Sequence, residues 1–147
     1  MASITLFVGS VYGNAENLAT QIETHLTAQG HRVNIADPAT IDEVKSAEHA
    51  LFVSSTTGQG DIPDNLYPLF IQMQAQMPML TNKNVGVVAL GDSSYGDTYC
   101  GAGRQIDALI QELNARIVQP RLDVDAGEYF EPWEAVEPWL TKWVAAL

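Results

Sequence analysis

Three glycine-rich segments hold most of the chain's clusters of serine, threonine and glycine. They read GSVYGNAE (9–16), SSTTGQGDIPDN (54–65) and GDSSYGDTYCGAG (91–103). Each follows an apolar run rich in strand-forming residues, and the second and third exceed the usual length of a connection between a strand and a helix. Their length and their polar side chains therefore suggest that they bind a ligand.

The first segment could bind an anion. Ser10 offers a hydroxyl, Asn14 offers an amide, and Gly13 lets the backbone approach closely. The amides that open the following helix also favour a negative charge. No lysine or arginine precedes Arg32, and neither the Gly-x-Gly-x-x-Gly nor the Gly-Lys-Ser/Thr fingerprint is present. A turn in which Ser10 or Asn14 caps the helix would explain the same residues.

The other two segments could face a planar ring. Ser55, Thr56 and Thr57 offer hydroxyls and amides for the edge of a heterocycle, whereas Tyr95 and Tyr99 can lie flat against an aromatic ligand. Packing within the loops is the alternative for the tyrosines, and helix capping is the alternative for Asp64 and Asn65. Together, the three segments describe a site for a mononucleotide with a planar ring.

The rest of the chain alternates between predicted strands and helices. Strands are expected at 3–9, 31–37, 50–55, 84–90 and 116–124, and helices at 14–29, 64–76, 102–114 and 132–147. This order predicts one α/β domain, residues 1–147, around a five-stranded parallel sheet. Pro120 indicates an edge position or a break in the last strand. Because parallel strands end at one edge, the three segments should meet there.

Composition excludes several classes of function. The chain has 147 residues, a net charge of −11 and a single cysteine, Cys100. An acidic surface repels nucleic acid and anionic lipid, although solubility alone would also explain the charge. The histidines show no metal-ligand spacing, and no apolar run is long enough to span a bilayer. We expect a cytoplasmic monomer without a metal, a disulfide, a nucleic-acid partner or a membrane partner.

With these motifs in order, the sequence resembles the flavodoxins and the flavodoxin-like FMN domains of cytochrome P450 reductase and sulfite reductase. GSVYGNAE looks like their phosphate loop, TTGQGDIPDN like the loop that flanks the isoalloxazine, and GDSSYGDTYCGAG like the loop that stacks on the flavin. The likeness covers almost the whole chain and implies a short-chain flavodoxin of strand order 2-1-3-4-5. It also implies non-covalent FMN and no catalytic acid, base or nucleophile.

The resemblance also implies the roles of individual residues. The FMN phosphate would be held by Ser10, Val11, Tyr12, Gly13, Asn14 and Ala15. The dimethylbenzene-to-N5 side of the ring would be lined by Ser55, Thr56, Thr57 and Gly58. The pyrimidine end and the second ring face would meet Leu90, Gly91, Asp92 and a stacked Tyr95, near Tyr99, Cys100 and Asp123. Many relatives have threonine at Tyr12 and an aromatic residue at Thr57, and losing one stack, worth about 1 kcal/mol, predicts weaker FMN binding.

The resemblance implies an electron carrier between an NAD(P)H-dependent flavoprotein reductase and a metalloenzyme or other acceptor. Carboxylates in or beside the loops should dock basic patches on these partners and lower the potential of the second one-electron reduction. Turn and capping preference is the alternative for these residues, which are Asp61, Asp64, Asp92, Asp97, Asp123 and Asp125.

Three other functions are compatible with this fold. A phosphoacceptor signalling domain needs acidic residues and a lysine at strand ends that here read GSVY, SSTT and RLDV. A small NAD(P)H-dependent flavin oxidoreductase would need a second nucleotide site. A protein-interaction module with weak or lost FMN binding remains open because of Thr57. Apolar spacing in the last helix explains Trp133, Trp139 and Trp143 better than flavin stacking does, and Cys100 is expected to pack rather than to act in redox chemistry.

Overall fold

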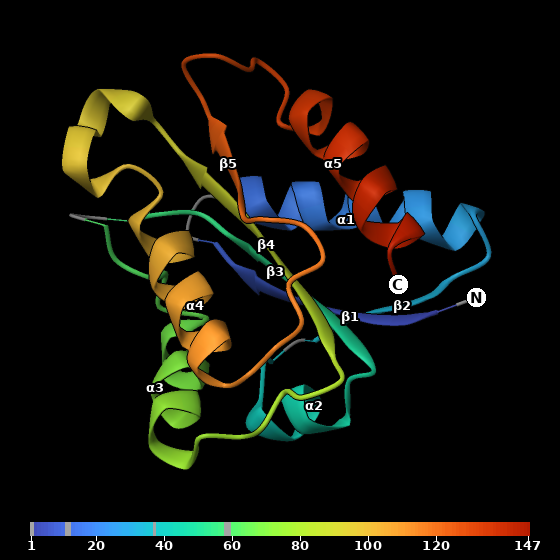
Figure 1. Ribbon diagram of the computed structural model, residues 1–147. Coiled ribbons are helices and arrows are strands. Elements are labelled where there is room, and N and C mark those ends of the chain that lie inside the picture. The colour runs from blue at the N-terminus through green and yellow to red at the C-terminus, as the bar shows by residue number, and fades with distance from the viewer. Residues whose placement is uncertain (1, 11–12, 37, 58–59) are drawn as a thin grey trace.

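A computed structural model describes residues 2–10, 13–36, 38–57 and 60–147 of the chain. Five parallel strands form one sheet of order β2-β1-β3-β4-β5, which confirms the predicted fold class and strand order (Figure 1). The strands are β1 (Ser3–Gly9), β2 (Arg32–Ile35), β3 (His49–Ser54), β4 (Asn84–Gly91) and β5 (Leu122–Asp125). Val11, Tyr12 and Gly58 lie outside the described residues, so their proposed roles stay predictions.

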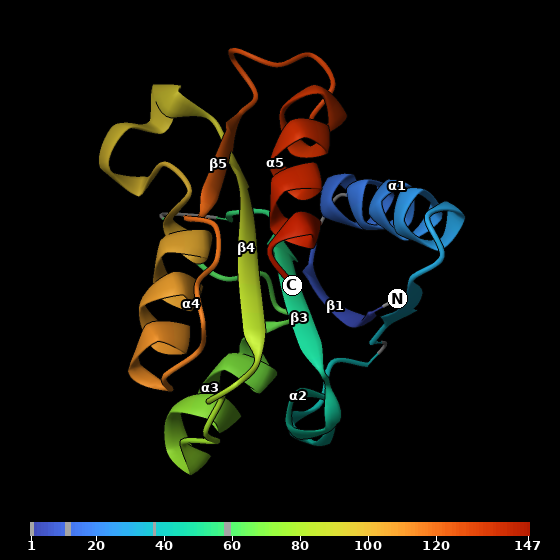
Figure 2. The same ribbon diagram turned by 45° about the vertical axis from the view of Figure 1, so that its right-hand side comes forward.

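Helices cover both faces of the sheet (Figure 2). Two of them pack on one face, α1 (Asn14–Ala28) and α5 (Trp133–Ala145). The other face is covered by α2 (Ile41–Ser46), α3 (Tyr67–Gln76) and α4 (Gly101–Glu112). A short 3-10 helix, η1 (Ser93–Thr98), follows β4. This arrangement leaves the ends of the central strands open to loops, as expected for a three-layer α/β domain.

The core consists of one apolar layer on each side of the sheet. Leu6 and Val8 of β1 belong to the layer under α1 and α5, whereas Phe7 between them packs in the opposite layer. Such burial on both faces explains why the central strands are nearly continuous apolar runs. Trp139 and Trp143 are buried and their rings stack with centroids 6.3 Å apart, which confirms that they are structural.

The largest differences from the sequence-based prediction are in β5 and α2. The fifth strand begins at Leu122, not at 116, and Arg116 makes only an isolated bridge to Asn84. Pro120 has no N–H for a sheet ladder, and its carbonyl instead accepts a hydrogen bond from Trp139 Nε1 at 2.9 Å. The short helix α2 was not predicted, because its six residues bury only Val44 and so show no helical periodicity.

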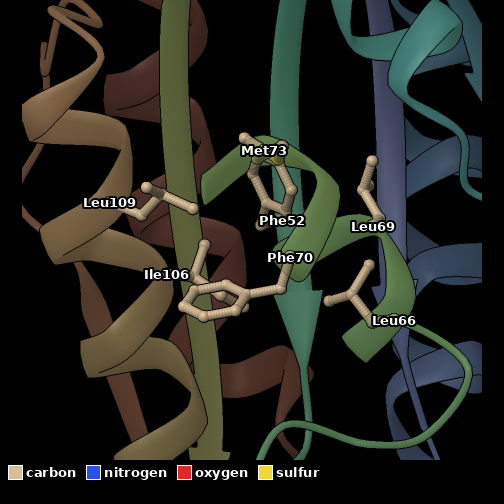
Figure 3. A pocket seen from close by; sticks show the side chains of 7 residues that line it. All are labelled: Phe52, Leu66, Leu69, Phe70, Met73, Ile106 and Leu109. Atoms are coloured by element: carbon tan, nitrogen blue, oxygen red, sulfur yellow. The ribbon is translucent and has the colours of Figure 1, made fainter. Parts of the chain in front are cut away.

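A small cavity lies between β3, α3 and α4 (Figure 3). It measures about 10 Å³ and is lined entirely by apolar side chains, including Phe52, Met73 and Leu109. A space of this size barely holds one water molecule, and its apolar lining offers that water no partner. It is therefore a packing defect of the core and not a ligand site.

Within the described ranges, no helix is both long and apolar enough to cross a membrane. The same residues contain no group of three or more histidine, cysteine, aspartate or glutamate side chains arranged to hold a metal ion.

Candidate cofactor-binding site

The three glycine-rich segments meet at the carboxyl edge of the sheet, as predicted. They follow β1, β3 and β4, which are neighbours in the sheet. The register aligns Gly9 with Ser54 and Ser54 with Ala89, so all three loops leave the sheet at the same level. Figure 1 shows these strand ends gathered on the side where η1 lies. One ligand can therefore contact all three loops.

The first loop leaves the N-terminus of α1 without a side-chain cap, so that its amides can bind an anion. Ser10 is 9% exposed, and its Oγ accepts a hydrogen bond from Gly13 N at 3.0 Å. Gly13 has φ = +87° and precedes α1 without a side-chain cap, a backbone conformation that suits glycine. Intrahelical bonds begin with Asn17 N to Gly13 O at 2.9 Å, so the first-turn amides have no intrahelical partner. Neither Ser10 nor Asn14 caps the helix.

Asn65 has a role that the sequence did not indicate. It was predicted as a possible cap of the next helix, but α3 begins at Tyr67 and has no side-chain cap. Instead, Asn65 Oδ1 accepts from Ser10 N at 2.9 Å, and Asn65 Nδ2 donates to Val8 O at 3.1 Å. The side chain therefore ties the end of β1 to the second loop.

The second loop contains a buried hydroxyl without a partner. Thr57 and Asp61 exchange backbone hydrogen bonds of 2.9 and 2.7 Å, and Thr57 Oγ1 donates to Asp61 O at 3.2 Å. By contrast, Thr56 Oγ1 is buried and contacts no donor or acceptor among the described residues. An unsatisfied buried polar group costs about 1–3 kcal/mol. An unpartnered hydroxyl in a loop is expected where a polar atom of a ligand supplies the missing hydrogen-bond partner.

The third loop is built around Cys100 and Gly91. A Cβ at Gly91 would lie 2.9 Å from both the N and the Sγ of Cys100, so only glycine fits there. Burial of the thiol, with Asp123 nearby, raises the pKa of Cys100 to about 11. Cys100 is therefore a neutral thiol packed beneath the loop, as predicted. Tyr95 lies in η1, but its side chain is outside the described part of the structure, so its stacking stays a prediction.

The second and third loops are fastened to each other by backbone contact. A Cβ at Gly101 would lie only 2.6 Å from Gly60 Cα, which shows how closely the two glycines approach. Gln105 of α4 also donates from Nε2 to Gly60 O at 2.7 Å. Sequence reasoning missed Gln105, because a glutamine on an amphipathic helix carries no distinctive signal.

Several carboxylates at this edge have structural partners. Asp92 Oδ1 accepts from Ser94 N at 2.9 Å. Asp125 Oδ1 accepts from Ser93 N at 3.1 Å and from Gly127 N at 2.9 Å. These hydrogen bonds, chiefly those from Ser93, lower the pKa of Asp125. The capping explanation therefore holds for Asp92 and Asp125.

Asp123 is not a free negative charge beside the loops. Its carboxylate accepts from Arg121 Nε at 2.7 Å, and Arg121 Nη1 contacts Asp107 Oδ2 at 3.0 Å. The pKa of Arg121 is raised, above all by its hydrogen bond to Asp123. Asp123 and Asp107 therefore share Arg121 as a common counter-ion.

A parallel sheet of this order with three polar loops at one carboxyl edge defines a mononucleotide-binding α/β protein of the flavodoxin-like class. The family model described as flavodoxin matches residues 6–139. Flavodoxin YqcA of Escherichia coli is 43% identical over 145 residues, covering 97% of each chain. This chain accordingly belongs to the flavodoxin family, whose cofactor is FMN.

Two further relatives agree with this family. A cysteine-to-alanine mutant of a flavodoxin from Pseudomonas aeruginosa superposes with a TM-score of 0.91 at 43% identity, covering 99% of this chain and 98% of that one. The sulfite reductase (NADPH) flavoprotein alpha-component of Vibrio parahaemolyticus is 34% identical over 125 residues, covering 83% of this chain and 20% of that protein. The match to only a fifth of the flavoprotein is expected if this fold is one module of it.

The described residues fit FMN. The first amides of α1, which have no intrahelical partner, suit its phosphate, and the unpartnered Thr56 hydroxyl suits a polar atom of its ring. Ser10 and Gly13 lie in the first loop, Asn14 and Ala15 open α1, and the second and third loops lie against each other. The roles of individual residues toward FMN stay predictions.

Proposed function

We propose that this flavodoxin carries electrons on non-covalently bound FMN from an NAD(P)H-dependent flavoprotein reductase to a metalloenzyme acceptor with basic docking patches. Bound FMN supplies the redox chemistry, and the protein supplies binding, orientation and charge. The observation that carries the proposal is the buried hydroxyl of Thr56, which lacks a partner within the described residues. A reducing compartment such as the cytoplasm suits the buried free thiol of Cys100.

A redox titration of the FMN-loaded protein tests the proposal. We expect a yellow protein that binds one FMN and takes up two electrons in separate steps, because the acidic loops oppose the second negative charge. Absorbance recorded at controlled potential measures both steps. Protein that stays colourless after addition of FMN would favour a pure interaction module. Oxidation of NADPH by the isolated chain would favour a small flavin oxidoreductase.

Replacing Thr56 with valine should change the stability of the FMN-free protein and the affinity for FMN in opposite directions. Valine has nearly the same shape but no hydroxyl, so it removes the unsatisfied group. The FMN-free protein should gain about 1 kcal/mol of unfolding free energy, whereas FMN should bind about fivefold to tenfold more weakly. Urea denaturation and FMN fluorescence titration measure the two effects.

Thr57→Val is the matched control, because its hydroxyl already donates to Asp61 O at 3.2 Å. That variant should lose stability by about 1 kcal/mol instead of gaining it. If Thr56→Val lost stability and kept its FMN affinity, the hydroxyl of Thr56 would not meet the cofactor.

A further inference from the structure

Phe130 is the most exposed large apolar side chain among the described residues. Its side chain is 91% exposed, whereas the next value in this group is 59%, at Met79. Burying a phenylalanine side chain stabilises a fold or a complex by about 1.5–3 kcal/mol. Phe130 does not contribute this free energy to the fold, because it is exposed. Phe130 lies in the connection from β5 to α5, five residues beyond the end of β5.

Hydrogen bonds fix the turn before Phe130 to the third loop of the cofactor site. Ala126 N donates to Gly91 O at 2.8 Å, which continues the carboxyl end of β4. Asp125 joins the two segments through Ser93 N and Gly127 N, and its carbonyl accepts at 3.0 Å from Glu128 N and from Tyr129 N. Figure 2 shows the connection rising beside the loop after β4. The aromatic side chain therefore leaves a fixed turn at the same sheet edge as the cofactor site.

Carboxylates surround Phe130 in the sequence. Residues 122–141 contain no lysine, arginine or histidine and six acidic residues: Asp123, Asp125, Glu128, Glu131, Glu134 and Glu137. Glu128 and Glu131, the acidic residues nearest to Phe130 in the chain, are exposed. A second copy of this chain would bring its own net charge of −11 to this surface, so like charges disfavour that occupant. The surface is complementary to a basic protein.

We propose that Phe130 is the aromatic anchor of a docking surface formed by residues 126–131. Its occupant is an electron-transfer partner that presents an apolar recess within a rim of lysine and arginine. This inference rests on the proposed electron-carrier function. A central aromatic side chain on a fixed turn commonly dominates binding energy, whereas the surrounding charges set the association rate.

Cytochrome c, a basic haem protein, serves as the probe. Two quantities are measured on the FMN-loaded protein: the dissociation constant for oxidised cytochrome c, and the second-order rate at which the reduced protein reduces it. Phe130→Ala should raise the dissociation constant about tenfold and lower the second-order rate about tenfold, which is the effect of losing an aromatic hot spot. The ionic-strength dependence should not change, because no charge is removed. Glu128→Gln with Glu131→Gln should instead reduce that dependence.

Met79→Ala is the matched control, because Met79 is 59% exposed and precedes β4, at the opposite edge of the sheet. It should leave both quantities unchanged. An unchanged dissociation constant in folded Phe130→Ala, or an equal loss in Met79→Ala, would overturn the proposal. If the unmutated protein failed to reduce cytochrome c while Phe130→Ala still weakened binding, the docking surface would stand and the carrier function would fall.

Discussion

Arg121→Met is expected to lower the free energy of unfolding by about 2–3 kcal/mol at neutral pH. Arg121 joins Asp107 of α4 to Asp123 of β5 at 3.0 and 2.7 Å. The three side chains are only 23, 16 and 28% exposed, so water cannot replace the guanidinium fully. Methionine fills the same space but leaves two partly buried carboxylates without a counter-ion. Urea denaturation measures the loss.

The loss should be the same at every pH near neutrality. The pKa of Arg121 is raised in the folded protein, chiefly by its hydrogen bond to Asp123. A raised pKa means that the stabilisation is fully present below the unfolded value and disappears only in strong alkali. Denaturation at several pH values around neutral should therefore give parallel curves for the variant and the unmutated protein.

Arg32→Met is the control, because Arg32 is exposed on β2 and forms no ion pair with any described residue. Its effect should stay within about 0.5 kcal/mol. If both variants lost equally little, the pairing of Arg121 would contribute nothing to stability. Adding Asp107→Asn and Asp123→Asn to Arg121→Met should restore part of the loss, since the uncompensated charges are then removed.

Most of the sheet could be predicted because its central strands are buried on both faces. Strands that are buried on both faces need apolar residues at nearly every position, and residues 50–55 and 84–90 show such continuous apolar runs. Edge elements lack this signal. The residues from Arg116 to Pro120 are rich in strand-forming types, yet the chain there bonds to Asn84 and Trp139 without forming a ladder. Tertiary contacts, and not local preference, decide where β5 begins.

The loops of the site could be predicted from their composition, but the contacts that hold them could not. Asn65 reaches Val8 and Ser10 across 57 and 55 residues of sequence, and Gln105 reaches Gly60 across 45. An asparagine or glutamine has the same local signature whether it faces water or ties two loops together. The ion pair of Arg121 with Asp123 is different, because the two residues lie only two positions apart and therefore share one face of an extended chain.

Gly101→Ala should weaken FMN binding by about tenfold, which corresponds to ~1.4 kcal/mol. The added Cβ would lie 2.6 Å from Gly60 Cα and 2.8 Å from Gly60 O. Both are backbone atoms, so the turn between Thr57 and Asp61 must move away from α4. That movement should stretch the hydrogen bond from Gln105 and displace Thr56, whose unpartnered hydroxyl we propose meets the cofactor. Fluorescence titration with FMN measures the change.

The stability change in Gly101→Ala has the opposite sign from the one expected of an ordinary helical glycine. Gly101 begins α4 with a helical backbone, where alanine would normally stabilise by about 1 kcal/mol. Overpacking against Gly60 costs about 1–3 kcal/mol and should outweigh that gain. A stabilised variant with unchanged FMN affinity would show that the second loop yields freely, and the two loops would then not act as one unit.

Gly30→Ala supplies the control for a loss of stability without a change at the site. Gly30 has φ = +91° with no atom within 4 Å of an added Cβ, so alanine meets conformational strain and no clash. The strain should cost about 1–2 kcal/mol, close to the effect at Gly101. Gly30 lies between α1 and β2, at the end of the sheet opposite the loops, so FMN affinity should not change. A loss of affinity confined to Gly101→Ala would therefore arise from the contact between the loops and not from lower stability in general.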